Sequence, residues 1–179
     1  MSDETTSNEA IEGLLNANPL LAFSVYTHLQ SEILDKLGTE ILQILDASIK
    51  ETHVEGVAFQ EVYGKTWLWV LGTYEVVRTM TGNRGAECFS DRTIRELEEL
   101  KRELAHLRIP FAKQELKGKS QVVSGEPSIA GINKAKRDFS FHINNRDIYM
   151  RPLIEKFRTV LSNISRTDVL KDLREAYQP

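Results

Sequence analysis

The stretch LQSEILDKLGTEILQILDASI, residues 29–49, decides the fold class of this chain. Its apolar residues recur at steps of four, at the positions Leu29, Ile33, Leu37, Ile41, Leu45 and Ile49. A recurrence of this kind predicts an amphipathic helix with one apolar face, so we expect a long helix that ends near Lys50. Asn18 followed by Pro19 is typical of a helix start, because proline at the first helical position has no N–H group to leave unpaired.

Two more helices are predicted farther along the chain. Apolar residues between about 58 and 80 recur at steps of three and four, at Phe59, Tyr63, Trp67, Val70, Tyr74 and Val77. Ser90 is a good N-cap for a third helix, whose heptad-like series is Leu97, Leu100, Leu104, Leu107 and Phe111. Pro110 interrupts this series and predicts a kink or an end near Ile109.

The C-terminal third changes its period. Phe139, Phe141 and Ile143 alternate with polar residues, and Asn144–Asn145 follows, which predicts a β-hairpin near residues 138–150. Pro152 then opens a last main helix, and a terminal helix is expected from about Thr167.

The pattern predicts one domain that covers residues 1–179. We expect an all-α fold, an antiparallel up-down bundle of about four or five helices with short connections and the small hairpin. Residues 1–7 are expected to fray. Residues 117–136, which are rich in glycine, are expected to form a mobile loop.

The net charge of −3 over 179 residues hides an asymmetry along the chain. Residues 1–63 hold eleven acidic and two basic side chains, a net charge of −9, whereas residues 64–179 hold fifteen acidic and twenty-one basic ones, a net charge of +6. The basic segment 113–137 carries six candidate phosphate- or partner-binding residues: Lys113, Lys117, Lys119, Lys134, Lys136 and Arg137. Such a cluster would attract phosphate groups, or it would face the acidic helix of the same chain or of a second copy.

Several classes of protein are disfavoured by composition. One cysteine, Cys88, cannot form an intramolecular disulfide. The four histidines, at 28, 53, 106 and 142, lack metal-ligand spacing, and we expect neither a metal nor a cofactor. The most apolar window, residues 66–74, is far shorter than the roughly 20 residues that span a bilayer. We therefore expect a cytoplasmic protein without membrane contact.

Residues 137–142 read Arg-Asp-Phe-Ser-Phe-His. This stretch resembles the signature of the HEPN superfamily, small helical bundles of which many are ribonucleases. The resemblance covers these six residues and implies metal-independent RNA cleavage, in which His142 activates the ribose 2′-OH and Arg137 stabilises the phosphate charge. If the stretch is a strand, however, Arg137 and His142 point to opposite faces, because positions five apart alternate.

No convergent catalytic set is visible, so the sequence favours a non-enzymatic interaction module. Its partner would be another protein or a second copy, bound through the acidic N-terminal and basic C-terminal halves. Trp69, which lies off the apolar series of its helix, is the candidate interface anchor. Two alternatives stay open: a HEPN-like ribonuclease that uses Arg137 and His142, and nucleic-acid binding without catalysis through the segment 113–137.

Overall fold

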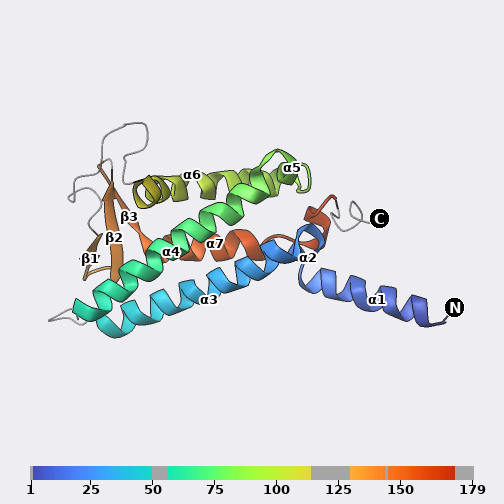
Figure 1. The fold of residues 1–179 in the computed structure, drawn as a ribbon, viewed down its shortest axis with the longest axis horizontal. Coiled ribbons are helices and arrows are strands. Elements are labelled where there is room, and N and C mark those ends of the chain that lie inside the picture. The colour runs from blue at the N-terminus through green and yellow to red at the C-terminus, as the bar shows by residue number, and fades with distance from the viewer. Residues whose placement is uncertain (1, 50–55, 114–129, 144, 172–179) are drawn as a thin grey trace.

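The protein is described here by a computed structural model that covers residues 2–49, 56–113, 130–143 and 145–171 (Figure 1). It is mostly helical, which confirms the expected class, and a small antiparallel sheet lies at one end. The helices are α1 Ser2–Ala17, α2 Leu20–Phe23, α3 Val25–Ser48, α4 Gly56–Thr81, α5 Asn83–Ala86, α6 Asp91–Lys113 and α7 Met150–Ser162. Helix α1 projects from the end opposite the sheet (Figure 1).

The first long helix begins later than the Asn-Pro signal predicts. Pro19 precedes the four-residue helix α2, and the chain turns again before α3 begins at Val25. The N-cap of α3 is Ser24, whose hydroxyl accepts the N–H of Thr27 at 3.2 Å. A serine hydroxyl in this position satisfies one of the amides that a helix start leaves unpaired.

The buried face of α3 differs from the four-residue series that predicts the helix. The buried residues alternate at steps of four and three: Thr27, Ser31, Leu34, Gly38, Ile41, Leu45 and Ser48. Of the predicted series, Ile41 and Leu45 are buried, whereas Leu29 and Ile33 are 48% and 62% exposed. A strict step of four rotates about 40° around a helix each time, so it leaves the buried face within a few turns.

Helix α4 shows the same correction. Its buried residues include Val62, Thr66, Trp69, Thr73, Val76 and Met80, again at steps of four and three. Tyr63 and Trp67, which the sequence places on the core side, are 37% and 40% exposed. Gly72 lies close to α3, since a Cβ there would lie 2.8 Å from Leu34 Cδ2.

The sheet has three strands rather than the two of a hairpin. Strands β2 (Asp138–Ile143) and β3 (Arg146–Tyr149) form the predicted hairpin, with Asn145 at a φ of 58°. Strand β1 (Ala130–Asn133) pairs antiparallel with β2, although these residues fall inside the predicted mobile loop. The rest of that loop up to residue 129 lies outside the described residues. Runs as short as Ala130–Asn133 carry little alternation, which is why the pattern misses this edge strand.

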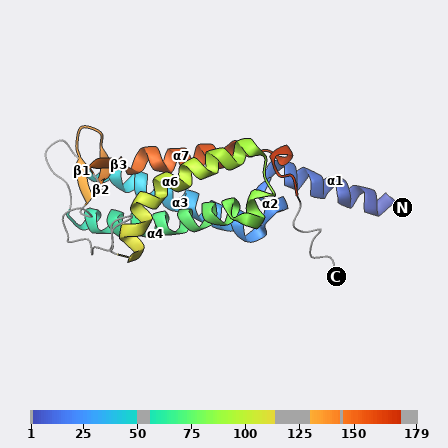
Figure 2. The same cartoon turned by 90° about the horizontal axis from the view of Figure 1, so that it is seen from above.

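Helix α6 continues through Pro110 to Lys113 instead of ending near Ile109. The yellow C-terminal part of α6 turns away from the line of the helix in Figure 2. A proline inside a helix removes one backbone hydrogen bond and bends the helix without always ending it. The bend carries Phe111 to Phe141 of β2, at a ring separation of 5.2 Å.

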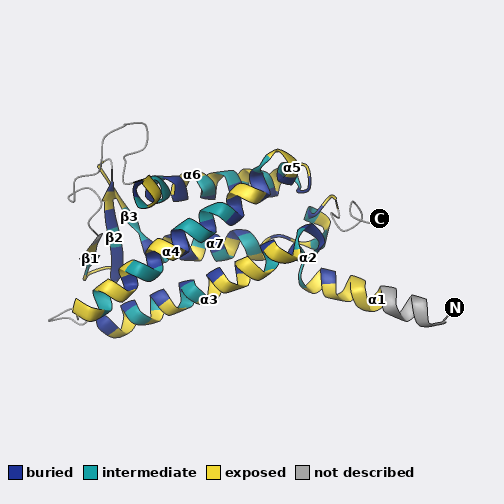
Figure 3. Cartoon of the chain, viewed as in Figure 1, coloured by how far each residue is buried: buried dark blue, intermediate teal, exposed yellow. Residues whose placement is uncertain are grey.

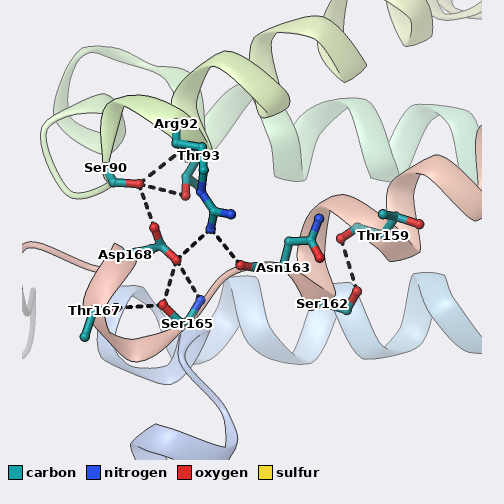
Figure 4. A network of polar contacts seen from close by, with 9 residues as sticks. All are labelled: Ser90, Arg92, Thr93, Thr159, Ser162, Asn163, Ser165, Thr167 and Asp168. Carbon is teal, nitrogen blue, oxygen red and sulfur yellow. Dashed lines mark hydrogen bonds and ion pairs between the residues drawn. The ribbon is translucent and has the colours of Figure 1, made fainter.

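The segment after α7 is fixed by polar contacts (Figure 4). Most of the terminal helix that is expected from about Thr167 lies outside the described residues. A short 3-10 turn, Arg166–Asp168, brings the carboxylate of Asp168 to the start of α6. There it accepts hydrogen bonds from the hydroxyls of Ser90 and Ser165, both at 2.7 Å, and pairs with Arg92 at 3.0 Å. These hydrogen bonds hold the pKa of Asp168 well below its usual range.

Candidate interaction surface

The stretch that resembles the HEPN signature is divided between a turn and a strand. Arg137 ends the turn between β1 and β2 with a φ of 49°, and its guanidinium donates to the carbonyl oxygen of Asp46 at 2.9 Å. His142 lies on β2, where its Nδ1 is 2.8 Å from Oδ1 of Asp147 on β3. In the described part of the chain, the two side chains share no partner. The structure thus gives each a separate contact and does not bring them together.

Asp138, the polar residue of the same stretch, is 2% exposed. Its carboxylate accepts the N–H of Phe139 at 2.8 Å and that of Arg151 at 3.0 Å. Burial raises the pKa of this carboxyl, and the hydrogen bonds from the two amides oppose the rise. Because Arg151 is in the first turn of α7, the carboxylate accepts a backbone N–H that the helix start leaves unpaired. Its negative charge also interacts favourably with the helix dipole. Asp138 therefore joins the sheet to α7.

Some of the acidic residues in the first half of the chain are paired with basic residues in the second half of the same chain. Three close ion pairs cross between the halves: Arg158 with Asp35 at 2.6 Å, Arg151 with Asp46 at 2.7 Å, and Lys65 with Glu40 at 2.6 Å. The hydrogen bonds of the ion pair with Glu40 raise the pKa of Lys65. These contacts agree with the interpretation in which the basic half faces the acidic helix of the same chain.

The candidate basic cluster is only partly assembled in the described residues. Lys134, Lys136 and Arg137 share one exposed turn between β1 and β2. The ammonium of Lys136 lies 3.7 Å from the ring centre of Tyr149, a cation–π contact. Lys113 is exposed on a different element, at the end of α6. The remaining two candidates, Lys117 and Lys119, lie outside the described residues.

Trp69 is not an intermolecular anchor, because its side chain is fully buried. Its Nε1 donates to the carbonyl oxygen of Leu34 at 3.0 Å, and its ring packs edge-on against Phe157 at 5.7 Å. The indole lies against Gly38, where a Cβ would come within 3.2 Å of Nε1. Trp69 thus joins α3, α4 and α7 within one chain. Its position off the apolar series fits a contact inside the chain as well as a contact with a partner, so the sequence does not separate the two.

Two of the hollows in the described part of the chain lie along α7, and most of the charged residues that line them have a partner. The first, about 330 Å³ between α6, β3 and α7, is lined by Glu103, His106, Arg146, Asp147 and Lys156 among others. Lys156 binds Glu103 at 2.7 Å, and Asp147 binds His142. The second, about 690 Å³ along α3 and α7, contains the Asp35–Arg158 pair. Neither holds the buried, unpaired ionisable group that a catalytic site commonly uses.

The described residues contain no group of three or more His, Cys, Asp or Glu placed to hold a metal ion. Over the same part of the chain, no helix is long and apolar enough to cross a membrane.

Several exposed apolar side chains lie on the α3–α4 pair. Besides Val25 and Val57, four larger apolar side chains on the α3–α4 pair are about half or more exposed: Tyr26 (80%), Leu29 (48%), Ile33 (62%) and Leu68 (55%). We call these four residues the α3–α4 apolar face. Figure 3 shows the exposed outer sides of both helices in yellow. Single exposed apolar residues are common, but a contiguous group marks an interaction surface.

Neighbouring contacts place the α4 member of this face beside α3. One turn before Leu68, Lys65 pairs with Glu40 at 2.6 Å. One turn after it, Gly72 faces the side chain of Leu34. Because α3 and α4 lie side by side over this length, Leu68 comes alongside the Leu34–Glu40 part of α3, which begins directly after Ile33. The four residues thus form one face that spans both helices.

Sequence reasoning found Leu29 and Ile33 but assigned them to the core. The positions of the small residues around the helix indicate which side is buried and which is exposed. Thr27, Ser31 and Gly38 keep the four-three spacing that two packed helices require, whereas Leu29 and Ile33 do not. Tyr26 and Leu68 were missed altogether, because neither belongs to a four-residue series.

Comparison with known proteins does not identify a family or a function for this chain. No family model, no curated protein and no solved structure matches the chain significantly.

Proposed function

We propose that this protein is a non-enzymatic interaction module that self-associates through the α3–α4 apolar face. The observation that carries the proposal is the inverted placement of side chains on these helices. Thr27, Ser31 and Thr73 are buried between elements, while Ile33 and Leu68 face outwards. Each large aliphatic side chain moved from water to an apolar contact contributes about 1.5–3 kcal/mol. A second protein surface would supply that contact.

The charge distribution supports an apolar contact over the electrostatic one suggested by sequence. Asp35, Glu40 and Asp46 already have basic partners in their own chain. A contact between the acidic half of one copy and the basic half of another would have to break these pairs. Exposed ion pairs contribute about 0–1 kcal/mol each, so such an exchange gains little.

Sedimentation velocity at low and high salt tests this proposal. We expect a concentration-dependent dimer that persists at about 1 M salt, where the Debye length is about 3 Å and charge attraction is screened. Ile33→Glu should raise the dissociation constant at least about tenfold, because it places a charge in an apolar contact. Val57→Glu is the matched control: Val57 is 83% exposed but lies at the other end of the molecule, at the start of α4. A monomer at all concentrations would contradict the proposal.

The ribonuclease alternative needs its own assay. Arg137 donates to the carbonyl of Asp46 in the last turn of α3, and Asp138 caps α7, so both have structural roles that explain their presence. Incubation with single-stranded RNA in EDTA should give no cleavage. Cleavage that is abolished by His142→Ala would favour the ribonuclease and overturn the non-enzymatic assignment.

Nucleic-acid binding without cleavage is addressed by the exposed turn between β1 and β2. Lys134 and Lys136 would contribute through phosphate contacts, whose affinity falls steeply with salt. We expect no binding of single-stranded RNA at about 0.15 M salt. Binding that is lost in Lys134→Ala/Lys136→Ala would establish this role instead.

A further inference from the structure

The smaller of the two hollows along α7 has the size and the mixed lining of a small-molecule site. It lies where the chain passes from β3 into α7, at the sheet end of the molecule, with α6 beside it (Figure 1). Its volume of about 330 Å³ is at the lower end of the range of about 300–1,000 Å³ for ligand pockets. Ile148, Pro152 and Leu153 give it an apolar wall. We call it the β3–α7 hollow.

One cation in this lining lacks a counterion. Lys156 binds Glu103 at 2.7 Å, and the carboxylate of Asp147 is 2.8 Å from the ring of His142. His106, which also lines the hollow, interacts with another residue as well.

The exception is Arg146, which is exposed. Its side chain has no hydrogen-bond or ionic partner in the described part of the chain. The five N–H donors of its guanidinium are therefore available to a ligand.

The register of the sheet places Arg146 on the side that faces the core. In the pairing of β3 with β2, Arg146 is opposite Ile143, and Ile148 is opposite Phe141. Directly opposite residues of an antiparallel pair have their side chains on the same face of the sheet. Because Ile143 and Phe141 are 2% and 0% exposed, Arg146 emerges on the same side as the apolar wall. It lies on an edge strand, where this side opens to solvent at the hollow.

This combination selects a ligand by charge and by shape. A guanidinium binds a carboxylate through two parallel hydrogen bonds. A second negative charge on the ligand would be repelled by the carboxylates of Glu103 and Asp147, which line the same hollow. The apolar wall favours a ligand whose remaining part is apolar.

We infer that the β3–α7 hollow binds a small apolar monocarboxylate, whose carboxylate pairs with Arg146 and whose apolar part packs against Ile148 and Leu153. The lining comes from α6, β3 and α7, so the hollow is separate from the α3–α4 apolar face. The inference goes beyond the proposed self-association and does not depend on it.

Titration of the full ¹⁵N-labelled chain, followed by ¹H–¹⁵N correlation spectra, tests the site. The probes are benzoate and hexanoate, with benzyl alcohol as the uncharged match and phenyl phosphate as the dianionic one. At least one carboxylate should shift the amides of Ile148 and Leu153 with saturation. We expect a dissociation constant of about 1 mM or below, which a ligand of this size reaches at ordinary efficiency per atom. Benzyl alcohol and phenyl phosphate should bind at least about tenfold more weakly than that carboxylate.

Arg146→Gln removes the charge and should raise the dissociation constant of the carboxylate at least about tenfold. The side chain is exposed, so the fold should persist, and the same spectra report whether it does. Arg84→Gln is the matched control. Arg84 is exposed on α5, at the end of the molecule opposite the sheet, and its replacement should leave binding unchanged (Figure 1).

Each other outcome overturns the inference. Without a saturable shift from either carboxylate, the hollow is not a carboxylate site. Equal binding of benzyl alcohol would mean that only the apolar wall acts, and tighter binding of phenyl phosphate would contradict the preference for a single charge. Unchanged affinity in Arg146→Gln would remove Arg146 from the site. Sedimentation of the same variants reports self-association separately, so a failure of this site is distinguishable from a failure of the proposed function.

Discussion

The apolar series with a four-residue step runs through both halves of α3, but its residues are buried in one half and exposed in the other. In the C-terminal half, Ile41 and Leu45 are 0% and 2% exposed. In the N-terminal half, Leu29 and Ile33 are 48% and 62% exposed, and the buried positions are held by Thr27 and Ser31 instead. The difference shows that an apolar residue at a helical step predicts a helix, whereas burial depends on the phase of that residue relative to its neighbours.

The largest expected effect comes from comparing one residue of each half. Leu45→Ala should lower the free energy of unfolding by about 3 kcal/mol, because it removes buried methyl groups and leaves a cavity. Ile33→Ala should lower it by less than about 0.5 kcal/mol in the dissociated chain, because the side chain is already in water. Urea unfolding followed by circular dichroism, at a concentration where the chain is monomeric, measures both. Equal losses would show that the two halves do not differ as described.

The close packing of the buried half can be tested at its glycine. A Cβ at Gly38 would lie 3.0 Å from Ile154 Cγ2 and 3.2 Å from Trp69 Nε1. Gly38→Ala should therefore destabilise the protein by about 2 kcal/mol. Gly64→Ala is the control, since nothing lies within 4 Å of a Cβ there. It should stabilise the protein by about 0.5–1 kcal/mol through helix propensity. A stabilising Gly38→Ala would contradict the contact between α3, α4 and α7.

The end of the molecule where α3 begins is also where Asp168 fixes the C-terminal segment. Asp168→Asn should destabilise the protein by about 1.5 kcal/mol at pH 7, because the carboxylate accepts several hydrogen bonds. Folding lowers the pKa of Asp168, so its stabilisation is complete above the ordinary value near 4 and is lost as the pH falls below it.

Thermal unfolding between pH 7 and pH 3 should thus show the difference between wild type and Asp168→Asn shrinking with acidity. A difference that stays constant over this range would assign the effect to packing rather than to charge. Sedimentation of this variant should match the wild type, because Asp168 is not part of the α3–α4 apolar face.

The smallest effect concerns the polar residues that replace apolar ones in the buried seam. The Thr73 hydroxyl is buried and has no hydrogen-bond partner among the described residues. Thr73→Val keeps the shape and should stabilise the protein by about 1 kcal/mol. Thr81→Val is the control and should destabilise it, since that hydroxyl donates to Val77 and accepts from Lys101. Calorimetry compares the two; a loss in both variants would mean that Thr73 has a partner.

Much of the fold was predictable because local signals agree with it. The helices at α3, α4, α6 and α7 follow from apolar spacing, and the hairpin of β2 and β3 follows from the alternation of Phe139, Phe141 and Ile143. Strand β1 was not predictable, because its own residues carry no strand pattern and its conformation depends on pairing with β2. The hydrogen bond between Ser90 and Asp168 was not predictable either, because the two residues are 78 apart in sequence.

The candidate site was less predictable than the fold. Residue type alone placed Arg137, Asp138 and His142 in one motif and Trp69 at an interface. In three dimensions Arg137 binds the end of α3, Asp138 caps α7, and His142 pairs across the hairpin. Only the contact of Arg137 with Asp46 joins elements far apart in sequence, since Asp138 and Arg151 are 13 residues apart and His142 and Asp147 are five apart.

By itself, the sequence determined that this chain is mostly helical, where its long helices lie, and that its two halves carry opposite net charges, because these properties depend on local spacing and composition. The tertiary structure alone decided which side of each helix is buried. Packing of α3 against α4 and α7 selects the side that carries Gly38 and Ser31, since small residues let the backbones approach closely. That choice turns Leu29 and Ile33 outwards, and with them the surface that we propose as the binding site.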